Sequence, residues 1–319
     1  MLYIAVFVCA VVGTYFIRSV FRKKELLDHP NDRSSHTIAT PKGGGLAIMI
    51  TFYGAITFLF FQENIDSRLF YALLSGVPLI LISLVDDIVP QPPKLRFGIQ
   101  LLSALGALYA LGGVQTLEFI SFSLSGIWVN ILALLGIIWM SNLYNFLDGI
   151  DGYAGSEALF VGVAVFLLFG NEVSLMLALS TAGFLLFNWD KATIFMGDVG
   201  SAPLGFIFAI FILYDAPTPN FVAWLILLSL FWFDATLTLI RRARRGEKLS
   251  QAHKKHAYQR LHQAGFSHAK VVMLSVGVNL LFLTALYLLP FAYWLYLFLA
   301  LLVLLYTLTK LIDMQKAFD

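Results

Sequence analysis

The chain has very little cysteine and little charge. A single cysteine, Cys9, stands among 319 residues, so neither an intramolecular disulfide nor a metal cluster of several thiolates can form. Charged residues make up only 13% of the chain, against 59% hydrophobic residues and a mean hydropathy of +0.82. A water-soluble domain of this length has no need of so many Leu, Phe, Ile and Val residues. The composition therefore excludes a disulfide-stabilised secreted domain and indicates a polytopic membrane protein.

The apolar runs predict helices that cross a membrane. Runs near the roughly 20 residues that a bilayer requires occur throughout, with no internal repeat and no second, soluble domain. We expect an all-α polytopic protein of about 11 transmembrane helices, with ten as the alternative count, forming one integral membrane domain over 1–319. The expected spans are 2–20, 45–61, 69–86, 97–112, 126–147, 155–170, 172–188, 199–214, 220–240, 270–289 and 291–312.

Basic residues are almost absent from one side of this predicted topology. Arg18, Arg22, Lys23 and Lys24 follow the first span rather than precede it, so this span is not a cleaved signal peptide. With that cluster in the cytoplasm, Arg68 is the only one of the 21 Lys and Arg residues that falls outside. The positive-inside rule therefore predicts an external amino terminus and a cytoplasmic carboxyl terminus.

Polar residues gather where the apolar run 127–140 ends. Asn142, Asn145 and Asp148 recur every three residues, so they share one stripe of a helix. A glycine then lets the helix end, and Asp151 begins a tight turn. Capping a helix end needs only one or two polar side chains, so four on one edge indicate a catalytic or binding site.

Further carboxylates lie at two other predicted cytoplasmic helix ends. Adjacent Asp86 and Asp87 cost roughly 2.5–3.5 kcal/mol each at mid-membrane. A cation bound between the two carboxylates would offset that cost, and so would a role for one of them as a proton acceptor. Alternatively, both residues lie in water just beyond the end of the helix and serve no site. Asp198 stands between glycines and is followed by Ser201 at a helix start, a pattern that suits a metal or phosphate site.

Glycines and cations complete the set of polar segments. Three glycines after Lys42 expose backbone N–H groups at a helix start, either as an anion cradle or as a flexible loop. His253 and His256 share a helix face, and phosphate-binding imidazolium beside Arg260 fits them better than zinc, for which further ligands are missing. Asp234 is expected to be a structural partner of an arginine about two turns further along.

All these groups fall on the predicted cytoplasmic side. Carboxylates and amides suit a hard cation such as Mg²⁺, which proteins bind with few ligands together with substrate phosphates. Lys, Arg and protonated His suit phosphate oxygens. An enzyme with its site at the membrane rim reaches a soluble nucleotide and a lipid headgroup together. The residues thus predict Mg²⁺-assisted phosphoryl transfer onto a lipid, in which positioning and charge neutralisation do most of the catalysis.

The same segments resemble the polyprenyl-phosphate N-acetylhexosamine-1-phosphate transferases of glycosyltransferase family 4. The resemblance runs in order from about 28 to 261. The motifs that carry it are Asp28-x-Pro-x-x-Arg33-x-x-His36 with Pro41-x-Gly-Gly, the pair Asp86-Asp87, Asn142-x-x-Asn-x-x-Asp-Gly-x-Asp-Gly152, Phe195-Met-Gly-Asp-x-Gly-Ser201 and His253-x-x-His-x-Tyr-Gln-Arg260.

The resemblance implies a role for each matching residue. It implies Mg²⁺, with Mn²⁺ as the alternative, bound by Asp198 and Asn145. It places an acidic pair beside the lipid phosphate, with one member a candidate base, and a histidine motif nearby. The implied catalytic residues are Asp86, Asp87, Asp148, His253 and His256. The implied substrate-binding residues are Lys42 near the phosphates, Asp151, Asn188 and Phe195 at the nucleotide, and Asn142 and Arg260.

The implied reaction transfers N-acetylhexosamine 1-phosphate from a UDP-sugar to undecaprenyl phosphate and releases UMP. The histidine motif departs from the family's clustered histidines and resembles the subgroup that starts O-antigen and related surface glycans. The expected sugar is therefore N-acetylglucosamine or a 6-deoxy sugar such as N-acetylfucosamine or N-acetylquinovosamine, not a muramyl pentapeptide. We expect a multi-pass protein of the bacterial inner membrane with a cytoplasmic active site. We expect it to contact membrane lipid and to have no nucleic-acid partner. The protein could also form a homodimer.

Two other classes stay open. A transporter or flippase of lipid-linked sugars would carry ionisable residues near mid-membrane rather than at one rim. A CDP-alcohol phosphatidyltransferase would share Mg²⁺ and paired Asp residues, but its Asp-Gly-x-x-Ala-Arg signature is absent because Ile-Asp-Gly follows the Asp148-Gly pair. Formation of UMP, of CMP or of no nucleotide from a nucleotide donor distinguishes the three.

Overall fold

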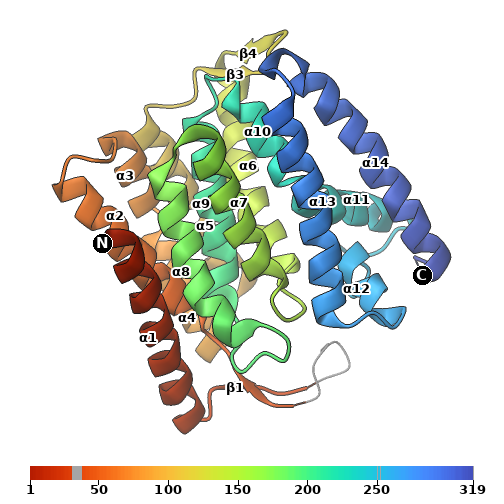
Figure 1. Ribbon diagram of the computed structural model, residues 1–319. Helices are drawn as coiled ribbons and strands as arrows, with labels where there is room; N and C mark the ends of the chain where they lie inside the picture. Colours follow the sequence, from red (N-terminus) through yellow and green to blue (C-terminus); the bar gives the residue numbers. More distant parts are fainter. Residues whose placement is uncertain (31–37, 250, 252, 319) are drawn as a thin grey trace.

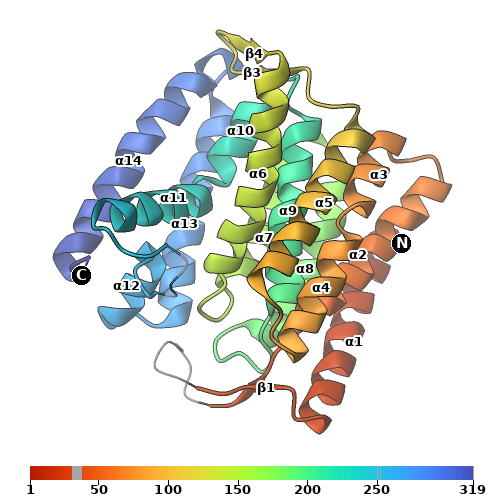
Figure 2. The same ribbon diagram turned by 180° about the vertical axis from the view of Figure 1, so that it is seen from behind.

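The fold is a bundle of helices with two very small hairpins (Figures 1 and 2). The computed structural model describes residues 1–30, 38–249, 251 and 253–318, so Arg33 and His36 of the first motif lie outside the described residues. The elements are α1 (Leu2–Lys23), β1 (Leu27–Asp28), β2 (Thr40–Pro41), α2 (Gly45–Phe61), α3 (Ser67–Leu74), α4 (Val77–Ile88), α5 (Pro93–Leu111), β3 (Thr116–Glu118), β4 (Ser123–Ser125), α6 (Ile127–Phe146), α7 (Tyr153–Phe169), α8 (Glu172–Asn188), α9 (Asp198–Tyr214), α10 (Asn220–Leu227), α11 (Ser229–Arg244), α12 (Ala257–Gln263), α13 (His268–Leu288), η1 (Phe291–Tyr293) and α14 (Trp294–Gln315).

The expected all-α class is confirmed. In the described part of the chain, 5 helices are long and apolar enough to cross a membrane by length and composition, or up to 6 if a bent pair forms one span. Four further apolar helices, α2, α7, α8 and α9, are 17 residues long each. Every one of the ranges expected to span the membrane is largely helical. The total of eleven crossings and their orientation stay predictions.

Two of the expected spans are interrupted. The range 69–86 breaks between α3 and α4 at Ser75 and Gly76, and a proline stands in the first turn of α4. The range 220–240 is split into α10 and α11, which meet at a bend of 65°. Figures 1 and 2 show α11 running across the bundle instead of along it. The break at Ser75 and Gly76 leaves a candidate span over Ser67–Ile88, whereas the bend between α10 and α11 interrupts a straight crossing.

Helix α9 forms the centre of the bundle, with nearly all of its residues buried. Glycines let two neighbours approach it closely. A Cβ on Gly205 would overlap the carbonyl of Met140 in α6, and a Cβ on Gly45 in α2 would overlap the Gly200 backbone. Helix α4 packs against the same helix. The first turn of α9, which begins at Asp198, is therefore surrounded by α2, α4 and α6.

The two ends of the bundle differ. The hairpin of β3 and β4 covers one end, whereas β1, α12 and the loops that precede α7 and α9 gather at the other (Figure 1). We call this second end the site end, because the residues singled out from the sequence gather there.

Candidate active site

The first turn of α9 is held by a carboxylate from another helix. Asp87 in α4 accepts hydrogen bonds from the backbone N–H groups of Asp198 and Val199, at 3.0 and 2.9 Å. Gly197 has φ +77°, and a Cβ there would lie 2.5 Å from an Asp87 carboxylate oxygen. Only glycine fits at position 197, because its φ is positive and because the Asp87 carboxylate leaves no room for a Cβ. Asp87 satisfies N–H groups that a helix start leaves without partners.

Two cations connect the acidic residues. The Lys42 ammonium lies 2.7 Å from Asp87 and 3.5 Å from Asp198. The Arg96 guanidinium contacts the carboxylate of Asp86 and lies 3.2 Å from that of Asp198. The sequence prediction did not include Arg96, although two prolines at the start of α5 fix the turn that carries it. Segments far apart in sequence thus join as one network of alternating charge.

Electrostatics keep Lys42 charged. Burial acts to lower the pKa of Lys42, but the nearby carboxylates of Asp198 and Asp87 outweigh burial and raise its pKa above the ordinary value. Its backbone is fixed as well, since Lys42 forms a parallel bridge with Phe195. A cation held in this way suits phosphate oxygens.

Asp148 lies just beyond α6 and is electrostatically coupled to this network. Burial, and after it the neighbouring Asp198 carboxylate, raises the pKa of Asp148 well above its usual value. Within the described residues, its carboxylate makes no hydrogen bond or ion pair. An unpaired carboxylate beside Asp198 is the arrangement that a cation would stabilise.

The two residues predicted to bind metal face one small cavity. Asp198 and Asn145 line a space of about 60 Å³ together with Arg96 and Asn142. The Asn142 amide donates to Gln100 and to the Ile138 carbonyl. Carboxylate and amide oxygens are ligands of hard cations, so the donor set fits Mg²⁺ with most of its shell left to water and phosphate.

A second pocket opens on the other side of the motif residues. It has a volume of about 340 Å³ and joins the turn after α6 to the loop before α9. Asp151 accepts from Ala192 N–H at 3.2 Å and lies 3.2 Å from His268 Nδ1. His268, at the start of α13, was not predicted from the sequence. The lining residues are Ile38, Thr40, Asp151, Asp190, Lys191, Ala192, Phe195, His262, Ser267 and His268.

Asn188 is brought near this pocket but does not line it. Its amide donates to the Ile194 carbonyl and accepts from Gly152 N–H, at 3.0 and 3.1 Å. Asn188 is also buried. The structure therefore places it between the two loops that form the pocket, as a bridge, and its contact with a nucleotide stays a prediction.

The histidine segment packs against the end of α6. His256 is buried, its ring lies 6.3 Å from that of Phe146, and its Nδ1 lies 3.7 Å from Asp234. Tyr258 donates to the Phe146 carbonyl at 3.0 Å. Burial, followed by His256 and Arg242, lowers the pKa of His253 to about 4. The imidazolium form expected of His253 is thus disfavoured at neutral pH.

One expectation for the cationic segment needs correction. Asp234 does not pair with Arg241: it accepts two hydrogen bonds of 2.9 Å from Ala257 N–H, while Arg241 binds Asp313. Arg260 is also buried, where it contacts Asp313 at 2.5 Å. Both arginines therefore hold α14 against the histidine segment, and a substrate contact for Arg260 stays a prediction.

The glycine run after Lys42 is not an anion cradle. The N–H groups of Gly43 and Gly44 both donate to the Phe195 carbonyl, and Gly45 N–H donates to the Met196 carbonyl. Their hydrogen-bonding capacity is used within the protein. The run is instead required for the close approach of α2 to the start of α9, which places Lys42 beside Asp198.

Comparison with known proteins supports one family. The model of glycosyl transferase family 4 matches residues 69–215. A probable undecaprenyl-phosphate N-acetylglucosaminyl 1-phosphate transferase of Bacillus subtilis is 29% identical, with 90% of this chain and 84% of the relative covered. A decaprenyl-phosphate N-acetylglucosaminephosphotransferase of Mycobacterium tuberculosis is 28% identical (83% and 77% covered). An undecaprenyl-phosphate alpha-N-acetylglucosaminyl 1-phosphate transferase of Escherichia coli K12 is 28% identical (87% and 80% covered). These matches support the polyprenyl-phosphate hexosamine-1-phosphate transferase family and a sugar-phosphate transferase activity for this chain.

Proposed function

We propose that the protein transfers N-acetylhexosamine 1-phosphate from a UDP-sugar to undecaprenyl phosphate, releases UMP and requires Mg²⁺, with Mn²⁺ as the alternative. The observation that carries this proposal is the network at the start of α9, where Lys42 and Arg96 lie between Asp86, Asp87 and Asp198. Two positively charged side chains lie beside the cavity that is lined by the Asn145 amide and the Asp198 carboxylate. This arrangement suits a reaction between two phosphorylated substrates. The names of the relatives support the same class of acceptor.

The donor diphosphate would bind at Lys42 and Arg96. Asp198 and Asn145 would hold the cation, which when bound screens the charge of the two phosphate groups. The pocket of about 340 Å³ begins at Phe195, three residues before Asp198, so a uridine attached to that diphosphate reaches it. Asp151 and Phe195 line this pocket and would contact the nucleoside, as their match to the family implies.

The lipid phosphate would attack the donor's β-phosphorus directly. A covalent route needs a free carboxylate, but both oxygens of Asp87 accept backbone N–H groups, and Asp86 is bound by Arg96 and by Gln91 N–H at 2.6 Å. The acidic pair therefore supports the positions of α9 and Arg96. A prenyl phosphate is itself an anionic nucleophile, so the main requirement is screening of the repulsion between two polyanions.

The sugar and the cellular role follow as finer proposals. We infer a donor bearing N-acetylglucosamine or a 6-deoxy N-acetylhexosamine, and a site on the cytoplasmic face of the bacterial inner membrane that starts O-antigen or another surface polysaccharide. The histidine segment, with its Ala257-Tyr258 sequence in place of clustered histidines, supports this subgroup over a muramyl-pentapeptide donor.

The test uses purified enzyme, undecaprenyl phosphate and a donor panel. UDP-N-acetylglucosamine, UDP-6-deoxy-N-acetylhexosamines, UDP-muramyl pentapeptide and a CDP-alcohol are compared by nucleotide release and by mass of the lipid product. We expect UMP and a lipid diphosphate sugar from one of the first two donors, dependent on Mg²⁺. Release of CMP, or UMP without lipid acceptor in an amount equal to the enzyme, would contradict the reaction or its single-step form.

A further inference from the structure

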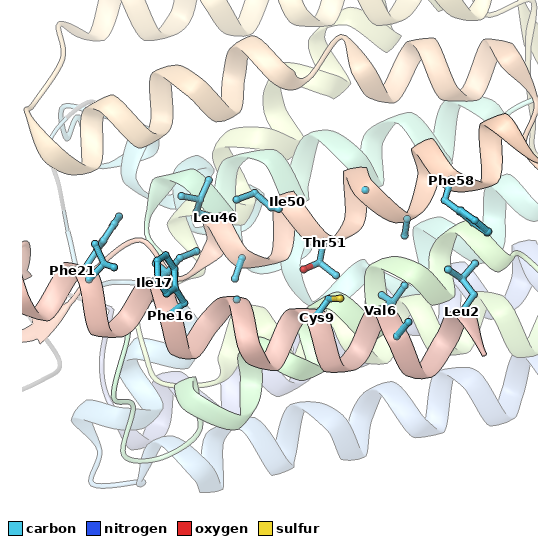
Figure 3. Close-up of a pocket in the computed structure, with 16 residues that line it drawn as sticks. Leu2, Val6, Cys9, Phe16, Ile17, Phe21, Leu46, Ile50, Thr51 and Phe58 are labelled. Atoms are coloured by element: carbon cyan, nitrogen blue, oxygen red, sulfur yellow. The ribbon is translucent and has the colours of Figure 1, made fainter.

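The cavities among the described residues differ in the ligand atoms that they offer. Figure 3 shows the groove between α1 and α2, whose lining is apolar except for the Cys9 thiol and the Thr51 hydroxyl, so it offers no set of metal ligands. The pocket of about 340 Å³ beside α13 is different, because two carboxylates and two imidazoles line it. The proposed reaction uses only one of these four groups, the carboxylate of Asp151.

Three of these side chains come together from distant segments. Asp151 stands in the turn before α7, Asp190 in the loop after α8, and His268 at the start of α13. Each offers one ligand atom, and these atoms all lie within 4.8 Å of one another. In a tetrahedral zinc site, two ligand atoms at about 2.0–2.1 Å from the metal are about 3.3 Å apart. His268 Nδ1 is already 3.2 Å from a carboxylate oxygen of Asp151, and the exposed Asp190 is free to close the remaining distance.

Hydrogen bonds orient His268 as a metal ligand. The backbone N–H of Asp151 donates to His268 Nδ1 at 3.3 Å, so this nitrogen carries a lone pair in the neutral ring. The carboxylate oxygen of the same aspartate then faces this lone pair, and a cation bound between the two atoms would remove their repulsion. The His268 side chain is only 7% exposed, and its Nε2 has no hydrogen-bond partner among the described residues.

A second imidazole lies beside this cluster. The ring centroids of His262, in α12, and His268 are 4.5 Å apart. His262 Nδ1 is 3.0 Å from the Phe266 carbonyl, which can only accept, so Nδ1 carries the proton and Nε2 has the lone pair in the neutral ring. A backbone carbonyl on the other ring nitrogen is a common way in which metal-binding histidines are oriented. His262 is therefore available as a fourth ligand, directly or through a water molecule.

The donor set favours a transition metal over magnesium. Mg²⁺ prefers oxygen ligands such as those of Asp198 and Asn145, whereas imidazole nitrogen suits Zn²⁺. Among the residues that line the pocket in the described part of the chain, Lys191 is the only Lys or Arg, and it is exposed. The two carboxylates therefore leave the pocket with an excess of negative charge.

We propose that Asp151, Asp190 and His268 bind a Zn²⁺ ion, which occupies the nucleotide pocket and thereby inhibits the enzyme in competition with the UDP-sugar. The metal site does not depend on the identity of the reaction. The competition rests on the proposed function, which places the uridine of the donor in this pocket.

Calorimetry tests the site without any substrate. Zn²⁺ is titrated into purified, chelator-treated protein with Mg²⁺ in excess, so that the oxygen site at Asp198 is filled. Asp190→Asn is the test variant, because an exposed side chain is replaced by one of the same shape, and His29→Ala is the control, because His29 is an exposed histidine outside the pocket. We expect one Zn²⁺ per chain, with affinity lowered roughly tenfold or more in Asp190→Asn and unchanged in His29→Ala. Equal affinity in the parent and Asp190→Asn would overturn the site.

Steady-state kinetics test the competition. With Mg²⁺ in excess, Zn²⁺ should raise KM for the UDP-sugar and leave kcat unchanged, and Asp190→Asn should need roughly tenfold more Zn²⁺ for the same effect. Inhibition that extra Mg²⁺ relieves equally in both proteins would place the ion at Asp198 and overturn the proposal. Zinc binding that leaves KM unchanged would overturn the competition.

Failure of the proposed reaction gives a different result. Zinc binding that is weakened in Asp190→Asn, in a protein that releases UMP from no UDP-sugar, would support the metal site and contradict the reaction. UMP release by a protein that binds no Zn²⁺ would support the reaction and overturn the metal site.

Discussion

Asp87 and Asp198 have different environments although both are motif carboxylates. Asp87 holds the first turn of α9, whereas Asp198 contacts Lys42 and Arg96 and lines a small cavity together with Asn145. We predict that Asp198→Asn abolishes transfer at ordinary Mg²⁺ concentrations because the amide removes a negative ligand, while the thermal unfolding temperature stays near that of the parent. UMP release and unfolding are measured on the same preparation. Near-normal turnover would remove the metal assignment.

Arg96 is predicted to bind phosphate in addition to its acidic neighbours. Arg96→Ala removes the cation between Asp86 and Asp198, so we expect kcat/KM for the UDP-sugar to fall by a factor of about 10–100, the size of one charge-assisted contact of about 1.5–3 kcal/mol. Lys94→Ala is the control, because Lys94 stands exposed on the same first turn of α5. A similar loss in both variants would mean that general surface charge, not the Arg96 contact, is responsible.

His253 gives a pH prediction. Its folded pKa of about 4 lies below the roughly 6.5 of an unfolded histidine, so the unfolded chain binds the proton first as pH falls. This depressed pKa therefore lowers stability progressively as pH drops from about 6.5 towards 4 and has no effect above about 6.5. His253→Gln should flatten the fall of the unfolding temperature across that window. An equally steep fall in the variant would contradict the depressed pKa.

Spacing and chemistry predicted the acidic residues but not all of their partners. Asp86, Asp87, Asp148 and Asp198 stand at helix ends in apolar sequence, which marks them without a fold. Arg96 and His268 lie in segments with ordinary polar composition, and only the packing of α5 and α13 places them at the site. Arg260 is the opposite case. Its position in the motif predicted that it binds phosphate, but in the structure it contacts Asp313 in the last helix.

At the scale of elements, close glycine contacts hold the helices that carry the site. Gly45 in α2 meets the Gly200 backbone in α9, so Gly45→Ala forces the two helices apart. We expect a loss of roughly 1–3 kcal/mol in stability, the usual range for overpacking, together with a large loss of activity as Lys42 moves from Asp198. Gly277→Ala in α13 is the control, since its Cβ meets nothing within 4 Å. Thermal unfolding and UMP release are compared, and unchanged behaviour of Gly45→Ala would contradict this contact.

The helix ranges could be read from the sequence because apolar length alone defines them. The breaks are less uniform. The bend of 65° between α10 and α11 falls inside an unbroken apolar run, with no proline within it to mark the place, so the sequence does not predict it. The break at Gly76 does have a local mark, the proline in the first turn of α4. A Cβ at Gly76 would also meet Phe206 and Tyr53, a contact that only the packing of the helices reveals.

At the scale of the whole molecule, the carboxyl terminus completes the site end. The Phe318 ring is buried against Arg241, at 3.9 Å, and lies within 5.0–5.6 Å of Arg245, Arg260 and Lys255. Cations stacked on an aromatic face are stabilised there. The residues that follow α14 thus hold the segment that carries His256.

The same asymmetry leads to a prediction of membrane orientation. The site end carries Lys42, Arg96 and the arginines of α11, and a soluble UDP-sugar must reach it from the cytoplasm, so the β3–β4 hairpin should face outward. In a Cys9→Ser background, a cysteine at exposed Gln263 of α12 should resist an impermeant thiol reagent in intact cells and react once the membrane is opened. A cysteine at exposed Ser123 of β4 should react in intact cells. The two positions serve as controls for each other, since the reagent must reach one and not the other. Labelling of Gln263→Cys in intact cells would reverse the orientation and place the diphosphate site on the wrong side for its donor.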